Sequence, residues 1–195
     1  MNNEKRISVV ALAFVSLFTS LTAIGAFIRI PIPFVPFTLQ ILFVYLAGSL
    51  LGSRLGGVSQ LAYIAMGLLG LPVFTEGGGL MYVFKPTFGY LIGFMAAAFF
   101  IGKFIEKHEN PQARHFYTAH FIGLFIVYAF GVTHFYFSMN IWYGLPTSIS
   151  HVLLYGFLVA VPGDIILCLF ASILAIRLHK HFPLTKKLRN EVRTA

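Results

Sequence analysis

Residues 155–178 read YGFLVAVPGDIILCLFASILAIRL, a stretch long and apolar enough to cross a membrane as a helix. Its middle contains Pro162-Gly163-Asp164, and Asp164 is the one acidic residue of the chain that lies inside an apolar run. A charged group at the centre of a spanning helix costs roughly 2.5–3.5 kcal/mol on insertion scales, and it usually faces the bundle interior or a water-filled cavity. Asp164 is therefore the best single indication of a ligand site.

The break at Pro162-Gly163 has two interpretations. In the first, proline and glycine kink one long helix, and Asp164 has the structural role of bonding to the freed backbone. In the second, residues 151–161 form a separate half-helix and Asp164 lies in the first turn of a new one, as in the broken helices of transporter binding sites. The carboxylate then accepts hydrogen bonds from N–H donors of a polar ligand.

The composition excludes an ordinary soluble domain. Of the 195 residues, 58% are hydrophobic and 10% are charged, whereas soluble domains carry about 25% charged residues. The net charge of +8 comes from basic residues at helix ends and in the tails, which is typical of topology signals, so we predict no nucleic-acid partner. The single cysteine, Cys168, lies in an apolar run and excludes a disulfide framework.

Six spans account for the apolar runs and predict an all-α membrane protein built as one bundle. They cover residues 8–28, 37–51, 56–71, 87–105, 116–137 and 151–178. The prolines of residues 29–36 (RIPIPFVP) cannot continue a helix, and Gly52-Ser53-Arg54 predicts a tight turn. The first span is longer than a usual signal core, so we expect it to stay uncleaved. Residues 1–182 are the predicted membrane domain, and residues 183–195 are a basic cytoplasmic tail.

The distribution of Lys and Arg predicts the orientation of the spans. With the N-terminus in the cytoplasm, nearly all basic residues fall on the inner side, and only Arg29 and Lys85 fall on the outer side. This asymmetry arises only with an even number of helices, so both termini are predicted to be cytoplasmic. The outer connections are then residues 31–36, 72–86 and 138–150. Together with Asp164 they can line one pocket that opens outward.

The segment Lys85-Pro86-Thr87-Phe88-Gly89-Tyr90 opens the fourth predicted span. A helix start exposes free N–H groups and the positive end of the helix dipole, and proline in its first turn is pre-organised. Lys85 adds a full charge, so the segment is a candidate dock for a carboxylate, with Thr87, Phe88 and Tyr90 beside it. The alternative is a capped helix start whose lysine reaches toward lipid headgroups.

The connection before this span is rich in glycine. Glu76 and Gly77-Gly78-Gly79 suit a mobile lid, although a solvated turn explains them equally well. Gly79 is therefore a candidate site residue. Some aromatic residues at this end of the spans belong to the interfacial belt, and a subset that includes Phe74 can close over an apolar ligand ring.

Ser16 and Ser20 give the first span a small-xxx-small spacing that lets another helix approach closely. In an isolated bundle this is internal packing, and in a complex it is a docking face for a partner. No Walker A, GxSxG or HExxH motif occurs in the sequence, and the histidines of the spans lack metal-ligand spacing. We therefore predict no ATP hydrolysis, no hydrolase activity, no metal and no cofactor.

These segments resemble the BioY family, whose members are the biotin-specific substrate-binding (S) components of energy-coupling factor (ECF) vitamin transporters. The matching stretches, in the family's order, are residues 33–40 (PFVPFTLQ), 50–57 (LLGSRLGG), 69–74 (LGLPVF), 86–94 (PTFGYLIGF) and 162–164 (PGD). The resemblance implies a six-helix protein that binds biotin at its outer side. It implies that Asp164 holds the ureido head, and that the energising partners are a membrane coupling subunit and two cytoplasmic ATPases.

The chain departs from the family pattern in four places. Leu167 stands where the family usually has a lysine after PGD, and the family's GPTGGY reads KPTFGY in residues 85–90. The alanine-based AxxxA docking pattern is replaced by its serine analogue, Ser16 and Ser20, and a long basic tail follows the last span. A positive charge relocated from position 167 to Lys85 accounts for the first two departures.

We therefore predict a multi-pass protein of the cell membrane, without enzymatic activity, that binds biotin for uptake. Asp164 suits the two ureido N–H donors, the apolar lining suits the ring and tail, and Lys85 suits the carboxylate. One rival is an S component for another vitamin, such as thiamine or riboflavin. A second is a small membrane enzyme that uses Asp164 with His151 in acid–base chemistry, and a third is a scaffold without a ligand.

Overall fold

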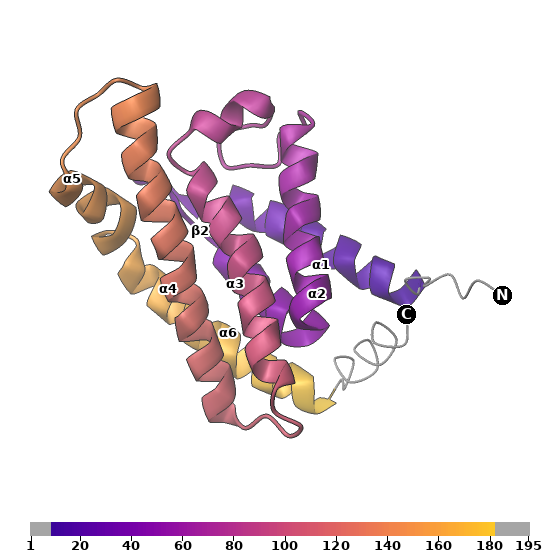
Figure 1. Ribbon diagram of the computed structural model, residues 1–195. Helices are drawn as coiled ribbons and strands as arrows, with labels where there is room; N and C mark the ends of the chain where they lie inside the picture. Colours follow the sequence, from indigo (N-terminus) through magenta and orange to yellow (C-terminus); the bar gives the residue numbers. More distant parts are fainter. Residues whose placement is uncertain (1–8, 182–195) are drawn as a thin grey trace.

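The computed structural model describes residues 9–181, which are mostly helical (Figure 1). In chain order the elements are α1 (Val9–Phe27), β1 (Arg29–Ile30), β2 (Phe37–Thr38), α2 (Gln40–Leu68), η1 (Leu80–Phe84), α3 (Phe88–Glu106), α4 (Ala113–Phe137), η2 (Ser138–Trp142), α5 (Ile149–Leu153), η3 (Leu154–Leu158) and α6 (Val161–His181). η1 is a 3-10 helix, and η2 and η3 are π-helical turns. Within the described residues, five helical segments are long and apolar enough to cross a membrane, so the chain is a multi-pass membrane protein.

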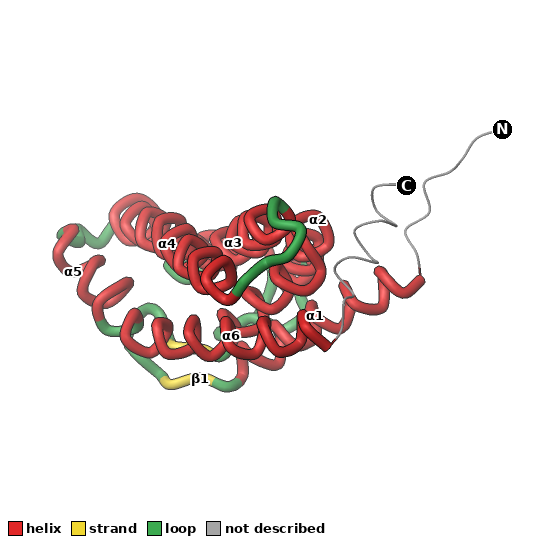
Figure 2. The backbone as a smooth tube through the Cα atoms, turned by 90° about the horizontal axis from the view of Figure 1, so that it is seen from below, coloured by secondary structure: helices red, strands yellow, loops and turns green. Residues whose placement is uncertain are grey.

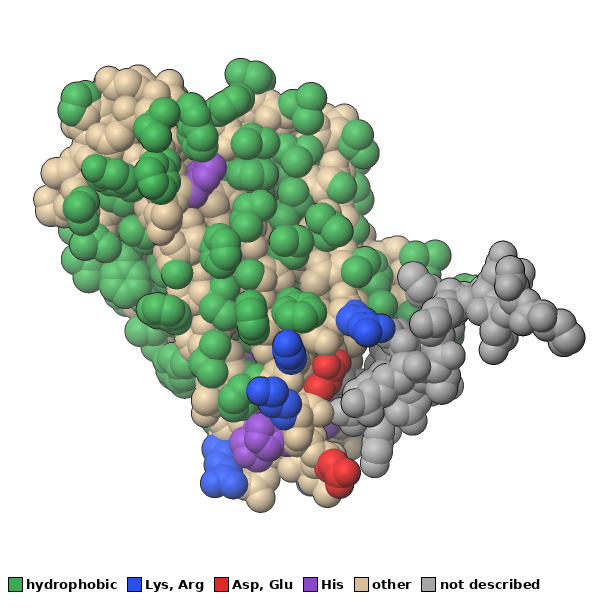
Figure 3. Space-filling model, in the orientation of Figure 1, with side chains coloured by type: hydrophobic (Ala, Val, Ile, Leu, Met, Phe, Trp, Pro, Cys, Tyr) green, Lys and Arg blue, Asp and Glu red, His purple; other side chains and the backbone are tan. Residues whose placement is uncertain are grey.

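The helices lie in two layers. Figure 2 shows α4, α3 and α2 in one row and α6 and α1 in a second row that faces it. Buried apolar side chains such as Tyr45, Ile101 and Val127 form the core. Large apolar side chains such as Phe125 and Phe170 are exposed instead. Figure 3 shows hydrophobic side chains covering the middle of one face. An outer surface of this kind is suited to lipid.

α2 contains a sharp reversal at Gly52, where the backbone has φ 83° and ψ −177°. A Cβ at Gly56 would lie 3.0 Å from the Cα of Gly48, so the two halves of α2 lie side by side. The Glu106 carboxylate accepts hydrogen bonds from the Ser53 backbone N–H at 2.9 Å and the Ser53 hydroxyl at 2.7 Å. The predicted turn at residues 52–54 is present. The expected spans 37–51 and 56–71 correspond to the two halves of α2, which meet at the non-helical backbone of Gly52.

The last apolar region breaks just ahead of the proline. α5 and η3 end at Leu158, and α6 begins at Val161, with the Asp164 N–H bonded to the Ala160 carbonyl at 3.1 Å. A proline in the first turn of a helix loses no needed donor. Asp164 lies in the first turn of α6, as the second interpretation predicts, and residues 149–180 together still form one helical span, as the first predicts.

The proline-rich connection forms a hairpin. β1 pairs with β2 in antiparallel register, Arg29 opposite Thr38 and Ile30 opposite Phe37. Between the strands, Phe34 takes a positive φ of 67°, and the Val35 N–H bonds to the Pro33 carbonyl at 2.8 Å. The second span therefore begins at Gln40 rather than at residue 37, because Phe37 and Thr38 are used by the hairpin.

Two further connections are more helical than expected. Residues 72–86 contain η1, and residues 138–150 contain η2 and the start of α5, because α4 continues into a π-helical turn. The predicted tail, residues 183–195, lies outside the described residues. The basic residues of the N-terminus that support the predicted orientation, Lys5 and Arg6, also lie outside them.

Candidate ligand-binding site

A cavity lies where the starts of α2, α3 and α6 meet the β1–β2 hairpin and the connection of residues 72–86, called here the 72–86 loop. Its polar lining consists of Thr38, Gln40, Thr75, Tyr82, Thr87, Tyr90, Tyr128 and Asp164, and its apolar lining of Val35, Pro36, Phe37, Ile41, Leu91, Phe94, Val127 and Ala160. An apolar wall with convergent polar groups is typical of small-molecule sites. The space open to the centres of water-sized molecules is about 50 Å³. Small-molecule pockets usually measure about 300–1,000 Å³, so a ligand of that size needs the lining to move outward.

Three helix starts border the cavity. α2 begins at Gln40, α3 follows its N-cap Thr87, and α6 begins at Val161. The first N–H groups of a helix have no partner within the helix and carry the positive end of its dipole. In α6 this end lies beside the Asp164 carboxylate. The starts of α2 and α3 suit hydrogen-bond acceptors of a ligand.

Asp164 keeps one oxygen available. Tyr128 Oη donates a hydrogen bond of 2.5 Å to Oδ2 of the carboxylate, and within residues 9–181 no donor bonds to Oδ1. The side chain is half-buried and lines the cavity. Gly163, directly before it, packs against the ring of Phe37, since a Cβ at this position would lie 2.6 Å from Phe37 Cε2. The turn that bears Asp164 therefore rests on the hairpin.

Gln40 is the second polar anchor, and it is 3% exposed. Its Oε1 accepts a hydrogen bond of 3.1 Å from Thr38 Oγ1, and its Nε2 donates one of 2.8 Å to Tyr63 Oη. Tyr63 in turn donates to the Val73 carbonyl at 2.9 Å. An amide nitrogen has two N–H donors, and one donor of Gln40 is unused by the described residues. This fixed amide can therefore donate to a ligand carbonyl.

Tyr82 joins the 72–86 loop to the start of α3. Thr87 Oγ1 donates to Tyr82 Oη at 3.0 Å, and Tyr82 Oη lies 3.0 Å from Thr75 Oγ1. Burial raises the pKa of Tyr82, although the hydrogen bonds with Thr75 and Thr87 lower it. The phenol is therefore neutral at physiological pH and can take part as both donor and acceptor. Tyr90 lies deeper, where its Oη donates to the Gly156 carbonyl at 2.6 Å.

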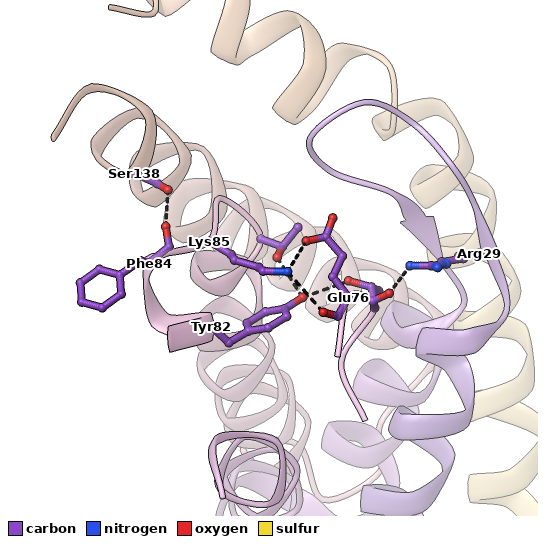
Figure 4. A network of polar contacts seen from close by, with 8 residues as sticks. Arg29, Glu76, Tyr82, Phe84, Lys85 and Ser138 are labelled. Carbon is purple, nitrogen blue, oxygen red and sulfur yellow. Dashed lines mark hydrogen bonds and ion pairs between the residues drawn. The ribbon is translucent and has the colours of Figure 1, made fainter. Parts of the chain in front are cut away.

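Exposed contacts hold the 72–86 loop over the cavity (Figure 4). Arg29 Nη1 of the hairpin donates to the Thr75 carbonyl. Lys85 Nζ pairs with Glu76 Oε2 at 2.9 Å and also donates to the Glu76 carbonyl at 3.2 Å. Both side chains of this pair are partly exposed, at 32% and 42%. Exposed ion pairs contribute about 0–1 kcal/mol, and this pair joins two residues of the loop itself, so it adds little to the attachment of the loop.

The structure brings together three of the predicted ligand residues, Asp164, Thr87 and Tyr90, all of which line the cavity. Four others lie outside its lining. Lys85 is turned toward Glu76, and Gly79 precedes η1 with φ 103°.

The other two are buried aromatic residues. Phe74 packs between Tyr63 and Tyr82 at ring distances of 5.3 Å and 4.5 Å. Phe88 packs against His134 at 5.8 Å. Both shape the elements around the cavity rather than its surface.

Sequence reasoning missed Gln40, Thr38 and Tyr128. Gln40 and Thr38 end the quoted stretch PFVPFTLQ, and an amide that opens an apolar span is a signal that could have identified Gln40. Tyr128 has no such signal, because it is one of nine tyrosines and only the packing of α4 on α6 brings it to Asp164.

Ser16 and Ser20 are both exposed on α1. The buried face of α1 instead uses Thr19, whose hydroxyl donates to the Ser59 carbonyl at 2.9 Å, and Thr22. Internal packing of the two serines is therefore wrong for the bundle described. Their face of α1 is open to lipid or to a partner.

Comparisons with known proteins identify the family of this chain. The model of the BioY family matches residues 1–184. A probable biotin transporter BioY of Lysinibacillus sphaericus is 50% identical over 185 residues, which cover 95% of this chain and 94% of that protein. The biotin transporter BioY of Thermotoga maritima is 39% identical over 166 residues, covering 84% of this chain and 92% of that protein.

A solved structure is also similar over nearly the whole chain. It is a crystal structure of the S-component for biotin from an ECF-type ABC transporter, with a TM-score of 0.77 and 29% identity. The match covers 92% of this chain and 95% of that one. The resemblance found in the sequence is confirmed, and the chain belongs to the BioY family.

Proposed function

We propose that this protein binds biotin in the cavity at Asp164 and serves as the substrate-binding component of a biotin transporter in the cell membrane. The family match and the names of the similar proteins support biotin as the ligand. The observation that carries the proposed site is the free Oδ1 of Asp164, a carboxylate oxygen without a partner among the described residues, in a cavity with apolar walls.

The chemistry of biotin suits the lining. Its ureido ring has two N–H donors, which suit the Asp164 carboxylate, and one carbonyl, which suits the unused N–H of Gln40. Its sulfur ring and aliphatic tail suit the apolar wall, which includes Phe37, Ile41, Leu91, Phe94 and Val127. Thr87 and Tyr90 would complete the polar rim.

For the carboxylate of biotin we propose Lys85, which would exchange Glu76 for the ligand. Leu167, at the position where the family usually has a lysine, is an apolar side chain packed against the core, so the positive charge must come from elsewhere. Lys85 lies on the 72–86 loop beside Tyr82, with its Nζ 5.2 Å from the centre of that ring. Gly79 and Phe74 would control the shape of this loop, and Phe88 would fix the position of the start of α3.

Entry of biotin requires the 72–86 loop to open. The free space of about 50 Å³ is too small for a ligand of this size. The contact of Arg29 with the Thr75 carbonyl is exposed, and two glycines with positive φ, Gly77 and Gly79, lie within the loop. The loop is therefore suited to act as the lid.

We further propose six spans, because the two halves of α2 run side by side about Gly52. An even number of spans places both termini on one side of the membrane, and the positive-inside rule makes that side cytoplasmic. Figure 3 supports this, since Lys and Arg side chains gather at one end of the visible face. The hairpin and the 72–86 loop would then face outward.

The proposed partners are a membrane coupling subunit and two ATPases, which supply the energy that this chain has no motif to supply. The exposed face of α1 with Ser16 and Ser20 is the proposed docking surface for the coupling subunit. Small residues allow a partner helix to approach closely within the bilayer.

The test is equilibrium binding of labelled biotin to the purified full chain in detergent, with thiamine and riboflavin as competitors. Saturable binding of one biotin per chain, displaced by unlabelled biotin alone, is the expected result. Displacement by another vitamin at lower concentration would reassign the ligand. Conversion of a bound compound into a product would favour the enzyme that uses Asp164.

A further inference from the structure

A second polar cluster lies between the helices, away from the cavity lining. It consists of His120 of α4, Ser49 of α2 and Ser172 of α6, and all three side chains are 0% exposed. His120 Nε2 lies 2.7 Å from Ser49 Oγ, and His120 Nδ1 lies 2.8 Å from Ser172 Oγ. One imidazole ring therefore connects three helices. Polar side chains inside membrane bundles are rare and usually have a functional role.

The direction of these hydrogen bonds follows from the backbone. Ser172 Oγ donates its proton to the Cys168 carbonyl at 2.8 Å. It must therefore accept a proton from Nδ1–H of His120. A neutral ring with its proton on Nδ1 has an acceptor at Nε2, so Ser49 donates there. Both ring nitrogens are used, and the cluster has no capacity left for a ligand. It is suited to act as a brace.

The His120 cluster and the ligand site both depend on the register of α6 on α4. Tyr128 and His120 are eight residues apart on α4, and their partners Asp164 and Ser172 are eight residues apart on α6. Equal spacing in opposite directions is what two antiparallel helices produce when they pair in constant register. At the rise of an α-helix, the two contacts lie about 12 Å apart along the helices. A shift of α6 that breaks one contact therefore breaks the other.

α6 needs such a brace because little else fixes its position. In the span that includes it, 22% of the most apolar window is buried, against 78% in α2. Helices in lipid gain no hydrophobic force from packing together, so interhelical hydrogen bonds and close contacts set their register. At its start, α6 follows the π-helical turn η3 rather than a regular helix.

We propose that His120 is a positioning residue for the ligand site, which holds α6 in register on α4 so that Asp164 faces the cavity. The bond to Ser49 ties the same ring to α2, the helix that begins with Gln40. Tyr45 supports the ring on this side, stacked at 5.1 Å and 25°. The proposal rests on the proposed function, because the anchoring of biotin by Asp164 is what the register serves.

The experiment compares four full-length variants by biotin binding in detergent. Ser172→Ala removes the bond to α6, Ser49→Ala removes the bond to α2, and His120→Gln keeps one acceptor and one donor. We expect Ser172→Ala to weaken biotin binding by about threefold to tenfold, as for one interhelical hydrogen bond. Ser49→Ala has a smaller effect, since α6 stays tied, and His120→Gln retains more affinity than His120→Leu.

A second background separates positioning from general loss of structure. In Tyr128→Phe, which breaks the other contact between α4 and α6, a further Ser172→Ala change should weaken binding more than it does alone, because no polar contact then holds the register. In Asp164→Asn, Ser172→Ala should change the residual affinity little, since the group that it positions is gone. An equal loss in all three backgrounds would overturn the proposal and indicate a general effect on folding.

The outcomes also separate this proposal from the proposed function. If the unsubstituted chain does not bind biotin, the function fails. If the chain binds biotin and Ser172→Ala binds it equally well, only the role of His120 fails. Should His120→Leu not fold, Ser172→Ala still decides, because it removes one hydroxyl and leaves the ring in place.

Discussion

The two polar clusters between α4 and α6 differ in what they leave unused. Around Asp164, Tyr128 supplies one hydrogen bond, and the second carboxylate oxygen faces a cavity. Around His120, both ring nitrogens bond to buried serines, and the ring lies outside the lining of the cavity at Asp164. Both clusters place ionisable groups inside a membrane bundle, yet only one has capacity for a ligand. Unused hydrogen-bonding capacity beside a cavity therefore distinguishes the candidate site from a cluster whose polar groups are all paired.

The strongest test of this comparison is Asp164→Asn. The amide can still accept from Tyr128, but it loses the charge that strengthens hydrogen bonds from the ureido group, so biotin affinity should fall about 10- to 100-fold. The melting temperature without biotin should stay close to that of the unsubstituted chain. Equilibrium binding and thermal unfolding measure the two effects, with Ser20→Ala as the matched surface control. Unchanged affinity would show that the open cluster is not the site.

His120→Leu should lower the stability of the bundle as well as the affinity for biotin. It leaves the Ser49 hydroxyl buried without a partner, which costs about 1–3 kcal/mol of stability. Thermal unfolding in detergent without biotin should therefore begin at a lower temperature than in Asp164→Asn. A variant with unchanged unfolding would mean that the closed cluster contributes nothing to the bundle.

Tyr128→Phe tests the hydrogen bond between Tyr128 and Asp164. The change removes the hydroxyl that orients Asp164 and retains the ring, so biotin affinity should fall by about threefold to tenfold. Binding of labelled biotin measures this loss. A gain in affinity would instead show that Tyr128 competes with the ligand for the carboxylate.

Lys85→Ala should have the smallest effect, because its side chain is partly exposed. Biotin affinity should fall by about twofold to fivefold, and affinity for biotinamide, which lacks the carboxylate, should stay the same. Glu76→Gln is the matched variant, since it frees Lys85 and should leave biotin bound at least as tightly. Equal losses for biotin and biotinamide would exclude a contact between Lys85 and the carboxylate.

Much of the fold follows from local properties of the sequence. Hydropathy and proline positions gave α1 and α3 to within a residue or two at each described end, and the glycine at position 52 predicted the reversal in α2. The hairpin was missed because its strands are two residues long and carry no alternating pattern. The continuation of α4 into η2 was missed because a π-helical turn has no composition of its own.

The candidate site was predictable only where a residue conflicts with its surroundings. Asp164 stands out because a carboxylate is costly in an apolar helix, and Thr87 and Tyr90 follow from the start of α3. The direction of Lys85 was not predictable, since it depends on where the loop carries Glu76. The contact of Tyr128 with Asp164 joins residues 36 positions apart in sequence. It depends on the register of α4 on α6, which no local pattern encodes.

Phe37 couples the 72–86 loop to Asp164. Its ring lies against Gly163, one residue before Asp164. Its strand partner Ile30 follows Arg29, which donates a hydrogen bond to the 72–86 loop. Opening of the 72–86 loop would therefore move the hairpin that supports the turn bearing Asp164. Binding and release of biotin would then both be coupled to movement of the hairpin. A bulkier residue at position 163 would displace Phe37 and hold the 72–86 loop open.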